Sequence, residues 1–312
     1  MPVGSPGRIS GVVMWGRHHV GMPVGVIDVG SNTVRVLVVR DGREVTSQRE
    51  MLRLGASVER YGRITPDKLA ETSEVVARFA DLARDAGADE IEILITSPGR
   101  QAENGADLVD VLARAGRCDA RILSAREEGL LAFKGALAVA SPPYRRRVAV
   151  VDVGGGSAQV VVGSRRAGPE WATSIDIGSQ RLTSRMLSDD PPRAKAVKAA
   201  RAEVEHYLDG LEPPAPRVAY AVGGSARALR RLAGSSRLGA EELDEVIALL
   251  ATTPISILIE RHGADPDRVR TMTAGAVILA CIQARLAVPL KVARSGLREG
   301  ALLELGARRA AA

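Results

Sequence analysis

The stretch "VGVIDVGSNTVRVLVV" at residues 24–39 places one acid, Asp28, in an apolar, β-branched run and follows it with Gly-Ser-Asn-Thr. A second stretch, "VAVVDVGGGSAQVVVG" at residues 148–163, repeats this plan around Asp152. In Rossmann and P-loop phosphate sites a helix begins directly after the glycines. Here β-branched residues follow each turn and Gly-Lys-Ser/Thr is absent, so we predict two strand–turn–strand hairpins with glycine at the corner.

One interpretation is that both are plain hairpins in which glycine supplies a positive φ. The two acids favour a second interpretation, because each occupies the last apolar position before its turn. A buried aspartate is costly unless it is paired, hydrogen-bonded or metal-bound. Two such hairpins facing each other would present backbone N–H groups and carboxylates to one cleft, which suits a phosphate chain carrying Mg²⁺.

Length and composition indicate an ordinary globular protein. The 312 residues are enough for two domains, with 46% hydrophobic and 26% charged residues. No apolar run reaches the roughly 20 residues that a membrane span needs, so no membrane partner is expected. The two cysteines match no metal-ligand spacing and no disulfide framework, which favours a reducing, cytoplasmic location.

The charge indicates an anionic partner. The net charge is +6, and only five of the 43 basic residues are lysines. Aromatic residues make up just 3% of the chain, whereas single-strand nucleic-acid binders usually stack bases on aromatic rings. We therefore expect no nucleic-acid partner and a phosphate-rich small molecule or polymer instead.

The first 21 residues are glycine-rich and lack the long apolar core of a signal peptide. They end at a second Met-Pro-Val-Gly, which begins at Met22 directly before the first predicted strand. We predict that residues 1–21 form a disordered extension, and both Met1 and Met22 remain candidate starts.

Beyond the hairpins, the chain resembles a known family. The matching stretches, in family order, are "IDVGSNTVRVLV" (27–38), "TSPGRQAEN" (96–104), "ILSAREEGLLAFKGA" (122–136), "VVDVGGGSAQVVVG" (150–163), "GSQRLT" (178–183), "AVGGSARAL" (221–229) and "SGLREGALLE" (295–304). Together they resemble the exopolyphosphatase/guanosine pentaphosphate phosphatase (Ppx/GppA) family of the actin–sugar kinase–chaperone superfamily.

The resemblance implies an α/β fold of two duplicated actin-like (ribonuclease H-like) domains, with mixed sheets and flanking helices around an interdomain cleft. We expect the N-terminal domain at residues 22–140 and the C-terminal domain at residues 141–312. "ASPPYRRR" (140–147) is the predicted linker, because it combines two prolines with a basic run. The family often dimerises, so a homodimer is one expected assembly.

Three further segments have patterns that predict structure. Residues 65–87 open with Thr-Pro, an N-cap followed by proline at the first helical position, and predict a helix. Residues 216–234 predict a strand, a Gly-Gly-Ser turn and a helix with Ser225 as N-cap, whose free N–H groups would form an anion site. Residues 268–288 predict an apolar helix in the core between the domains.

The adjacent acids of "LSAREEGLL" can be assigned separately. Ser124 and Glu127 have capping-box spacing, so Glu127 has a structural task at the helix start. Adjacent helical residues diverge by about 100°, so only one of the pair can face the cleft, and Glu128 is left for that position. A simple helix-dipole partner is the alternative for Glu128. The resemblance implies that the second glutamate of this pair activates the attacking water.

The activity that the resemblance implies is hydrolysis of a terminal phosphoanhydride that depends on Mg²⁺ or another divalent cation. Inorganic polyphosphate is the favoured substrate and guanosine pentaphosphate (pppGpp) the alternative. Glu128 would be the base, Asp28 and Asp152 would hold Mg²⁺ or orient water, and Arg100, at a strand-to-helix junction where an arginine can fork onto phosphate, would contact the chain. The predicted phosphate-binding residues are Gly30, Ser31, Asn32, Thr33, Gly154, Gly155, Gly156, Ser157, Gln159, Gly223, Gly224, Ser225 and Arg298.

Two other classes of function remain open. A kinase of the same superfamily would transfer phosphate to an acceptor. A phosphate- or nucleotide-binding regulator with weakened catalysis is the other, because Gln159 stands where the family usually has glutamate. Gln159 lies two positions past Ser157 in a strand, so we expect both to face the cleft.

Overall fold

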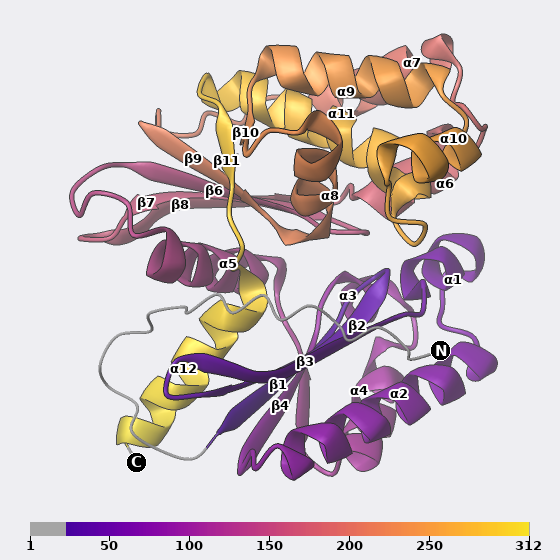
Figure 1. The fold of residues 1–312 in the computed structure, drawn as a ribbon. Coiled ribbons are helices and arrows are strands. Elements are labelled where there is room, and N and C mark those ends of the chain that lie inside the picture. Colours follow the sequence, from indigo (N-terminus) through magenta and orange to yellow (C-terminus); the bar gives the residue numbers. More distant parts are fainter. Residues whose placement is uncertain (1–22, 312) are drawn as a thin grey trace, which may run out of the picture.

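The computed structural model describes residues 23–311, which form two α/β lobes, one above the other in Figure 1. The lower lobe contains a five-stranded sheet in the order β3-β2-β1-β4-β5. Its strands are β1 (Val24–Val29), β2 (Thr33–Arg40), β3 (Arg43–Met51), β4 (Glu90–Ile95) and β5 (Asp119–Ile122). β1 pairs antiparallel with β2 and parallel with β4, so the first predicted hairpin forms within a mixed sheet.

The upper lobe repeats this arrangement in a six-stranded sheet of order β10-β11-β9-β6-β7-β8. Its strands are β6 (Val148–Val153), β7 (Ala158–Ser164), β8 (Gly168–Ile175), β9 (Val218–Val222), β10 (Arg237–Leu238) and β11 (Leu290–Val292). β6 pairs antiparallel with β7 and parallel with β9, as β1 does with β2 and β4. The predicted fold class and both hairpins are therefore confirmed.

Helices cover the outer face of the first sheet. They are α1 (Leu54–Tyr61), α2 (Pro66–Asp85), α3 (Ser97–Gln101) and α4 (Gly105–Gly116). α2 begins at Pro66 after Thr65, as the sequence predicts. Its buried Val76 and Phe79 join Leu108 and Leu112 of α4 in the core against this sheet.

Two helices, α5 (Ala125–Ala140) and α12 (Leu297–Ala311), pack against each other between the sheets (Figure 1). Phe133 of α5 packs with residues of β6, β7 and β9, whereas Leu302 of α12 packs with Val26 of β1. α12 thus lies on the first sheet, although the predicted C-terminal domain includes it. The division at residues 140 and 141 stays a prediction for the rest of the chain.

The remaining helices cover the far face of the second sheet. They are α6 (Ser179–Met186), α7 (Ala194–Leu208), α8 (Gly223–Ala233), α9 (Ala240–Thr252), α10 (Ile255–His262) and α11 (Val269–Leu286). The prediction that α11 forms the core between the domains is wrong, because it packs against α6, α7, α8, α9 and β6 inside the upper lobe. α11 is apolar and long enough to cross a membrane, but 78% of it is buried within the protein, as expected for a core helix.

The predicted disordered extension at residues 1–21, and with it the choice between Met1 and Met22, lies outside the described residues.

Candidate active site

The two hairpins make the same tight turn. Gly30 N donates to Thr33 O at 3.1 Å, and Gly154 N donates to Ser157 O at 3.0 Å. The next two amides of each tip, at residues 31–32 and 155–156, donate to no group in the described part of the chain. Backbone N–H groups that are free in a turn form an anion-binding site, so both tips are equipped to bind phosphate oxygens.

Close approach, rather than backbone conformation, requires the glycines of the second tip. None of the glycines at residues 30 and 154–156 has a positive φ, so the interpretation that these glycines supply one is wrong. A Cβ at Gly155 would lie 2.7 Å from Ser31 Cβ, and one at Gly156 would lie 2.7 Å from Ser97 Oγ. The glycines therefore let the two tips touch across the space between the lobes.

Three carboxylates meet at these tips. Asp28 at the end of β1, Asp152 at the end of β6 and Glu128 of α5 line one cavity of about 110 Å³. Burial raises the pKa of Asp28, and the charge of Arg35 opposes this shift. Burial, together with the negative charge of Asp28, raises the pKa of Asp152 to about 6. A cation between the two aspartates would relieve both effects.

The α5 N-terminus positions Glu128. Ser124 N donates to Glu127 Oε2 at 2.8 Å and Glu127 N donates to Ser124 Oγ at 3.1 Å, which confirms the predicted capping box. Glu127 is exposed, whereas Glu128 is buried, and its burial raises the pKa of Glu128 to about 7. This value suits a general base that works near neutral pH.

Arg100 lies beside Glu128 and outside the cavity lining. Its Nη2 atom is 2.8 Å from Glu128 Oε2, but the contact is an ion pair and lacks the alignment of a hydrogen bond. The guanidinium also donates to Leu123 O at 2.8 Å and to Ser157 Oγ at 3.2 Å. The predicted phosphate contact of Arg100 stays a prediction, and the structure places this residue so that it positions Glu128.

Gln159 of β7 and Ser157, directly before this strand, point to the same side, as expected, but neither lines the cavity. Gln159 is 1% exposed, and its Nε2 donates to Ser157 Oγ at 2.9 Å and to Ser174 Oγ at 3.2 Å. Since Ser157 Oγ also accepts from Arg100, Gln159 is linked to Glu128 through two intervening residues. The expected direct contact of Gln159 with the cleft is therefore wrong.

The turn between β9 and α8 lines the same cavity as the two hairpin tips. α8 begins at Gly223 with Val222 as N-cap, so the predicted N-cap role of Ser225 is wrong, and the Ser225 hydroxyl instead donates to Val153 O at 3.1 Å. Gly223 has φ +84° and a Cβ there would overlap the Asp152 carboxylate, so glycine is required twice over. No side chain caps α8, and Gly224 joins Gly223 and Ser225 in the cavity lining.

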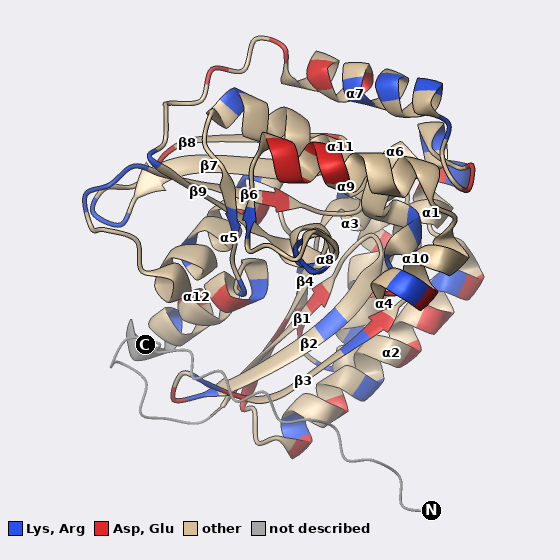
Figure 2. Ribbon diagram, turned by 45° about the horizontal axis from the view of Figure 1, so that its top comes forward, with Lys and Arg blue, Asp and Glu red and all other residues tan. Residues whose placement is uncertain are grey.

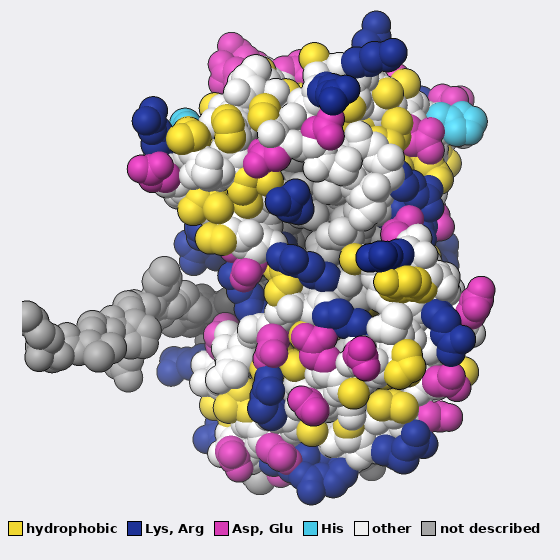
Figure 3. Space-filling model, turned by 90° about the vertical axis from the view of Figure 1, so that its right-hand side faces the viewer, with side chains coloured by type: hydrophobic (Ala, Val, Ile, Leu, Met, Phe, Trp, Pro, Cys, Tyr) yellow, Lys and Arg dark blue, Asp and Glu magenta, His cyan; other side chains and the backbone are white. Residues whose placement is uncertain are grey.

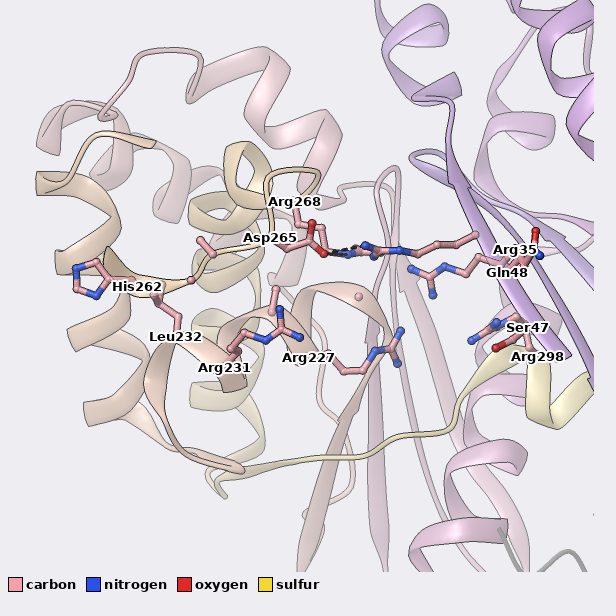
Figure 4. A pocket seen from close by; sticks show the side chains of 15 residues that line it. Arg35, Ser47, Gln48, Arg227, Arg231, Leu232, His262, Asp265, Arg268 and Arg298 are labelled. Atoms are coloured by element: carbon pink, nitrogen blue, oxygen red, sulfur yellow. Dashed lines mark hydrogen bonds and ion pairs between the residues drawn. The ribbon is translucent and has the colours of Figure 1, made fainter. Parts of the chain in front are cut away.

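A second cavity of about 400 Å³ continues from the first, and the two share several lining residues. Its arginines are Arg35, Arg49, Arg227, Arg231, Arg268 and Arg298. Figure 4 shows guanidinium groups from both lobes directed into this space, and Figure 3 shows basic side chains gathered where the lobes meet. We call this second cavity the arginine pocket.

Of these arginines, the sequence pointed only to Arg298. Arg35 had a usable signal, because it is a lone charge in an apolar strand, as Asp28 is. Burial and the neighbouring arginines lower the pKa of Arg35 well below its usual range. Arg227 and Arg268 had no such signal, since arginine is common on the helices of this chain.

The cavity suits Mg²⁺ held partly by a substrate. Asp28 and Asp152 supply two carboxylates, and the buried Asn32 Oδ1 atom accepts no hydrogen bond from the described residues. Residues 23–311 contain no cluster of three or more His, Cys, Asp or Glu side chains that could hold a metal alone. Mg²⁺ usually binds through one or two carboxylates, water and substrate phosphates, so the residues present fit this ion.

Two copies of one mixed sheet, with facing hairpin tips between them, define the actin-like ATPase fold class. The model of the Ppx/GppA phosphatase family matches residues 36–308. Exopolyphosphatase 1 of Mycobacterium tuberculosis is 32% identical to this chain and the alignment covers 90% of the chain and 88% of that protein. Exopolyphosphatase 2 of the same organism is 33% identical over 60% of this chain and 61% of its own length. The chain therefore belongs to the Ppx/GppA phosphatase family.

Solved structures agree with this assignment. The crystal structure of an exopolyphosphatase-like protein matches with a TM-score of 0.85 at 26% identity, covering 92% of this chain and 99% of that one. The Ppx/GppA family member of Aquifex aeolicus matches with a TM-score of 0.78 at 23% identity, covering 92% and 98% of the two chains. The second likeness supports the fold alone.

Proposed function

We propose that this protein is an exopolyphosphatase that releases the terminal phosphate of inorganic polyphosphate with the help of Mg²⁺. The observation that carries the proposal is that the cavity containing Glu128 opens directly into the arginine pocket. A polyanionic chain can lie in the pocket while its end reaches the base. The names of the relatives, exopolyphosphatases 1 and 2, support the same substrate.

The residues divide the reaction between them. The terminal phosphate binds between the hairpin tips, where the free amides at residues 31–32 and 155–156 donate to its oxygens. Glu128 accepts a proton from a water molecule placed in line with the scissile bond, and the shortened chain leaves through the arginine pocket. Asp28 and Asp152 would hold Mg²⁺, which would supply neutralisation of the charge on the phosphates.

The lining of the arginine pocket favours polyphosphate over pppGpp. It contains six arginines and one acid, Asp265, and no Phe, Tyr or Trp within the described part of the chain. A guanine base would have to lie against Ala228, Leu232 and Ala264, and the imidazole of His262 is the one aromatic ring that the described lining offers it. A linear chain of phosphates needs only the cations.

The structure also weakens the case for a regulator without catalysis. That case rests on Gln159, but Gln159 does not line the cavity, and the acids that do are Asp28, Glu128, Asp152 and Glu299. The loss of one glutamate at position 159 therefore leaves the cavity itself intact. We propose a working hydrolase rather than a binding protein.

The test is phosphate release from the purified protein. Polyphosphates of several lengths and pppGpp are supplied separately, each with Mg²⁺ and with EDTA, and the Glu128→Gln variant is the control for a contaminating phosphatase. We expect Mg²⁺-dependent release from polyphosphate that the variant lacks. Faster release from pppGpp at equal concentration would assign the alternative substrate, and ATP-dependent phosphorylation of an acceptor would identify a kinase.

A further inference from the structure

A cluster of arginines lies at the end of the second sheet that is opposite to the cavity. It is built from residues 141–147 before β6, the β7–β8 turn at residues 165–167, and Arg217 before β9. Arg166 N donates to Tyr144 O at 3.0 Å and Arg217 N donates to Arg147 O at 3.0 Å, so backbone hydrogen bonds hold the three segments together. Figure 2 shows blue ribbon gathered at this end of the sheet.

We call the exposed members of this cluster the arginine patch: Arg145, Arg146, Arg147, Arg165, Arg166 and Arg217. Among the described residues one acid neutralises one of them, since Arg147 lies 3.1 Å from Glu170. Arg165 donates to the backbone at Pro142 O, and the other four side chains have no hydrogen bond or ion pair with residues 23–311.

The four unpaired arginines lie on segments that backbone hydrogen bonds hold close together, so their positive charges repel one another. Their side chains make no hydrogen bond or ion pair in the described chain that would stabilise the fold. Residues on the same sheet end offer little compensation, because Glu212 before β9 pairs with none of these arginines in the described chain. Such a surface attracts a flexible polyanion, which can place a negative group at each cation. The loops are therefore arranged as a binding surface rather than as a neutral surface of the sheet.

We propose that the arginine patch binds a distal segment of a long inorganic polyphosphate chain whose end occupies the cavity at Glu128. This inference rests on the proposed function. Arg147, directly before β6, and Asp152 within it are five residues apart, so a chain that reaches both must cover at least about 17 Å. Tripolyphosphate is too short to reach both places, whereas a long chain spans them and is held near the cavity at a raised local concentration.

Inorganic polyphosphate fits the patch better than nucleic acid or a lipid surface does. Tyr144 is the one aromatic side chain in the three segments, so successive bases would have no platform on which to stack. The segments also lack the large apolar residues, apart from Tyr144, that insert between lipid head groups. A polyanion without bases needs only positive charge, which the patch supplies.

Two charge-reversed double variants test the inference. Arg146→Glu with Arg166→Glu changes the patch, and Arg43→Glu with Arg114→Glu is the control, because these two arginines are also exposed and have no ion pair in the described chain. The KM for long-chain polyphosphate should rise at least about fivefold in the patch variant alone, as expected for lost electrostatic attraction. The KM for tripolyphosphate should stay within about twofold in both variants.

Equal changes in the two variants, or an unchanged KM for the long chain, would overturn the inference. A second measurement is direct binding of labelled long-chain polyphosphate in EDTA, with single-stranded DNA and anionic vesicles as competing ligands. Loss of DNA or vesicle binding without loss of polyphosphate binding would assign the patch to that other partner. If the unmodified protein hydrolyses neither polyphosphate, the proposed function fails, while the binding measurement still decides the patch.

Discussion

The β1–β2 and β6–β7 hairpins share a backbone but differ in what lies opposite their aspartates. In the first, Asp28 is the direct cross-strand partner of Arg35, and in the second, Asp152 is the partner of Gln159. One duplicated turn has thus acquired a cation in one copy and a neutral amide in the other. The turn itself positions the phosphate, and the residue opposite the aspartate sets the local charge.

The tips differ in a complementary way. Ser31 and Asn32 give the first tip side chains, whereas glycines at residues 154–156 leave the second tip bare. The contact between Gly155 and Ser31 explains this difference, because two tips with side chains could not approach so closely. The asymmetry between the copies therefore follows from their meeting in one site, and mutations in matched positions should have unequal effects.

The largest effect is expected at Glu128, which both aspartates face. Glu128→Gln should lower kcat at least about 10²-fold, the low end for loss of a general base, while KM changes little. Initial rates of phosphate release measure both constants. Glu127→Gln is the matched control, since it removes only a capping partner and should cost about 1 kcal/mol of stability or less.

The free energy of unfolding of Glu128→Gln, measured as a function of pH, distinguishes the loss of a general base from damage to the fold. The pKa of Glu128 is raised from 4.5 to about 7, so its contribution to stability is present below pH 4.5 and is lost as the pH rises through 7. Glu128→Gln should remove that part of the decline. If Glu127→Gln lost the activity and Glu128→Gln kept it, the assignment of the base would be wrong.

The second effect contrasts glycines at the two tips. Gly155→Ala should destabilise the protein by about 2 kcal/mol, because its Cβ would lie 2.7 Å from Ser31 Cβ. At Gly30 the nearest atom to a new Cβ is Thr33 O at 3.3 Å, so Gly30→Ala should change stability by less than about 1 kcal/mol. Urea unfolding measures both values, and equal effects would show that the tips do not meet in solution.

The local backbone signals of the sequence were sufficient for much of this structure. β-branched runs on both sides of each turn predicted the hairpins, and Ser124 with Glu127 predicted the helix start that directs Glu128 inward. These features depend on neighbours within a few residues of each other. The resemblance to the family then supplied the cleft and the pairing of the two hairpins.

The features that the sequence did not predict depend on long-range packing. α12 packs on the first sheet although it follows the strands of the second, and α11 is buried within the upper lobe. Both positions are set by contacts with residues distant in the sequence. Arg227 of α8 and Arg268, directly before α11, reach the cavity from separate segments, and their convergence has no local pattern. Gln159, outside the cavity lining, donates a hydrogen bond to Ser174 on the next strand, a partner that its local sequence does not indicate.

The third effect tests the cation of the first hairpin. Arg35→Gln gives this hairpin the amide that the second one has, and it should raise the KM for polyphosphate about tenfold through the loss of one charge-assisted contact. The kcat of this variant should fall by a smaller factor than the factor by which its KM rises. Arg49→Gln, at the exposed rim of the same pocket, is the control and should change KM less. A larger effect from Arg49 would place the chain outside the buried part of the pocket.

The smallest effect is expected at Gln159, which stands where the resemblance implies a glutamate. Gln159→Glu adds a buried negative charge that is connected to Glu128 through Ser157 and Arg100. This charge disfavours ionised Glu128 and raises its pKa further above 7. Since the base must be ionised, kcat/KM should fall about threefold below pH 7 and remain nearly unchanged at pH 9, as a pH profile would reveal.

Gln159→Met is the neutral control and should leave the acid limb of the profile near pH 7, because it changes hydrogen bonds without adding charge. The alternative outcome is that a glutamate at position 159 helps to bind the metal and raises activity. That outcome would appear as a lower Mg²⁺ midpoint and a faster rate in Gln159→Glu at every pH. A Mg²⁺ titration of the three proteins at pH 6 and pH 9 therefore decides whether residue 159 acts on the base or on the metal, and the buried position of Gln159 outside the cavity favours the base.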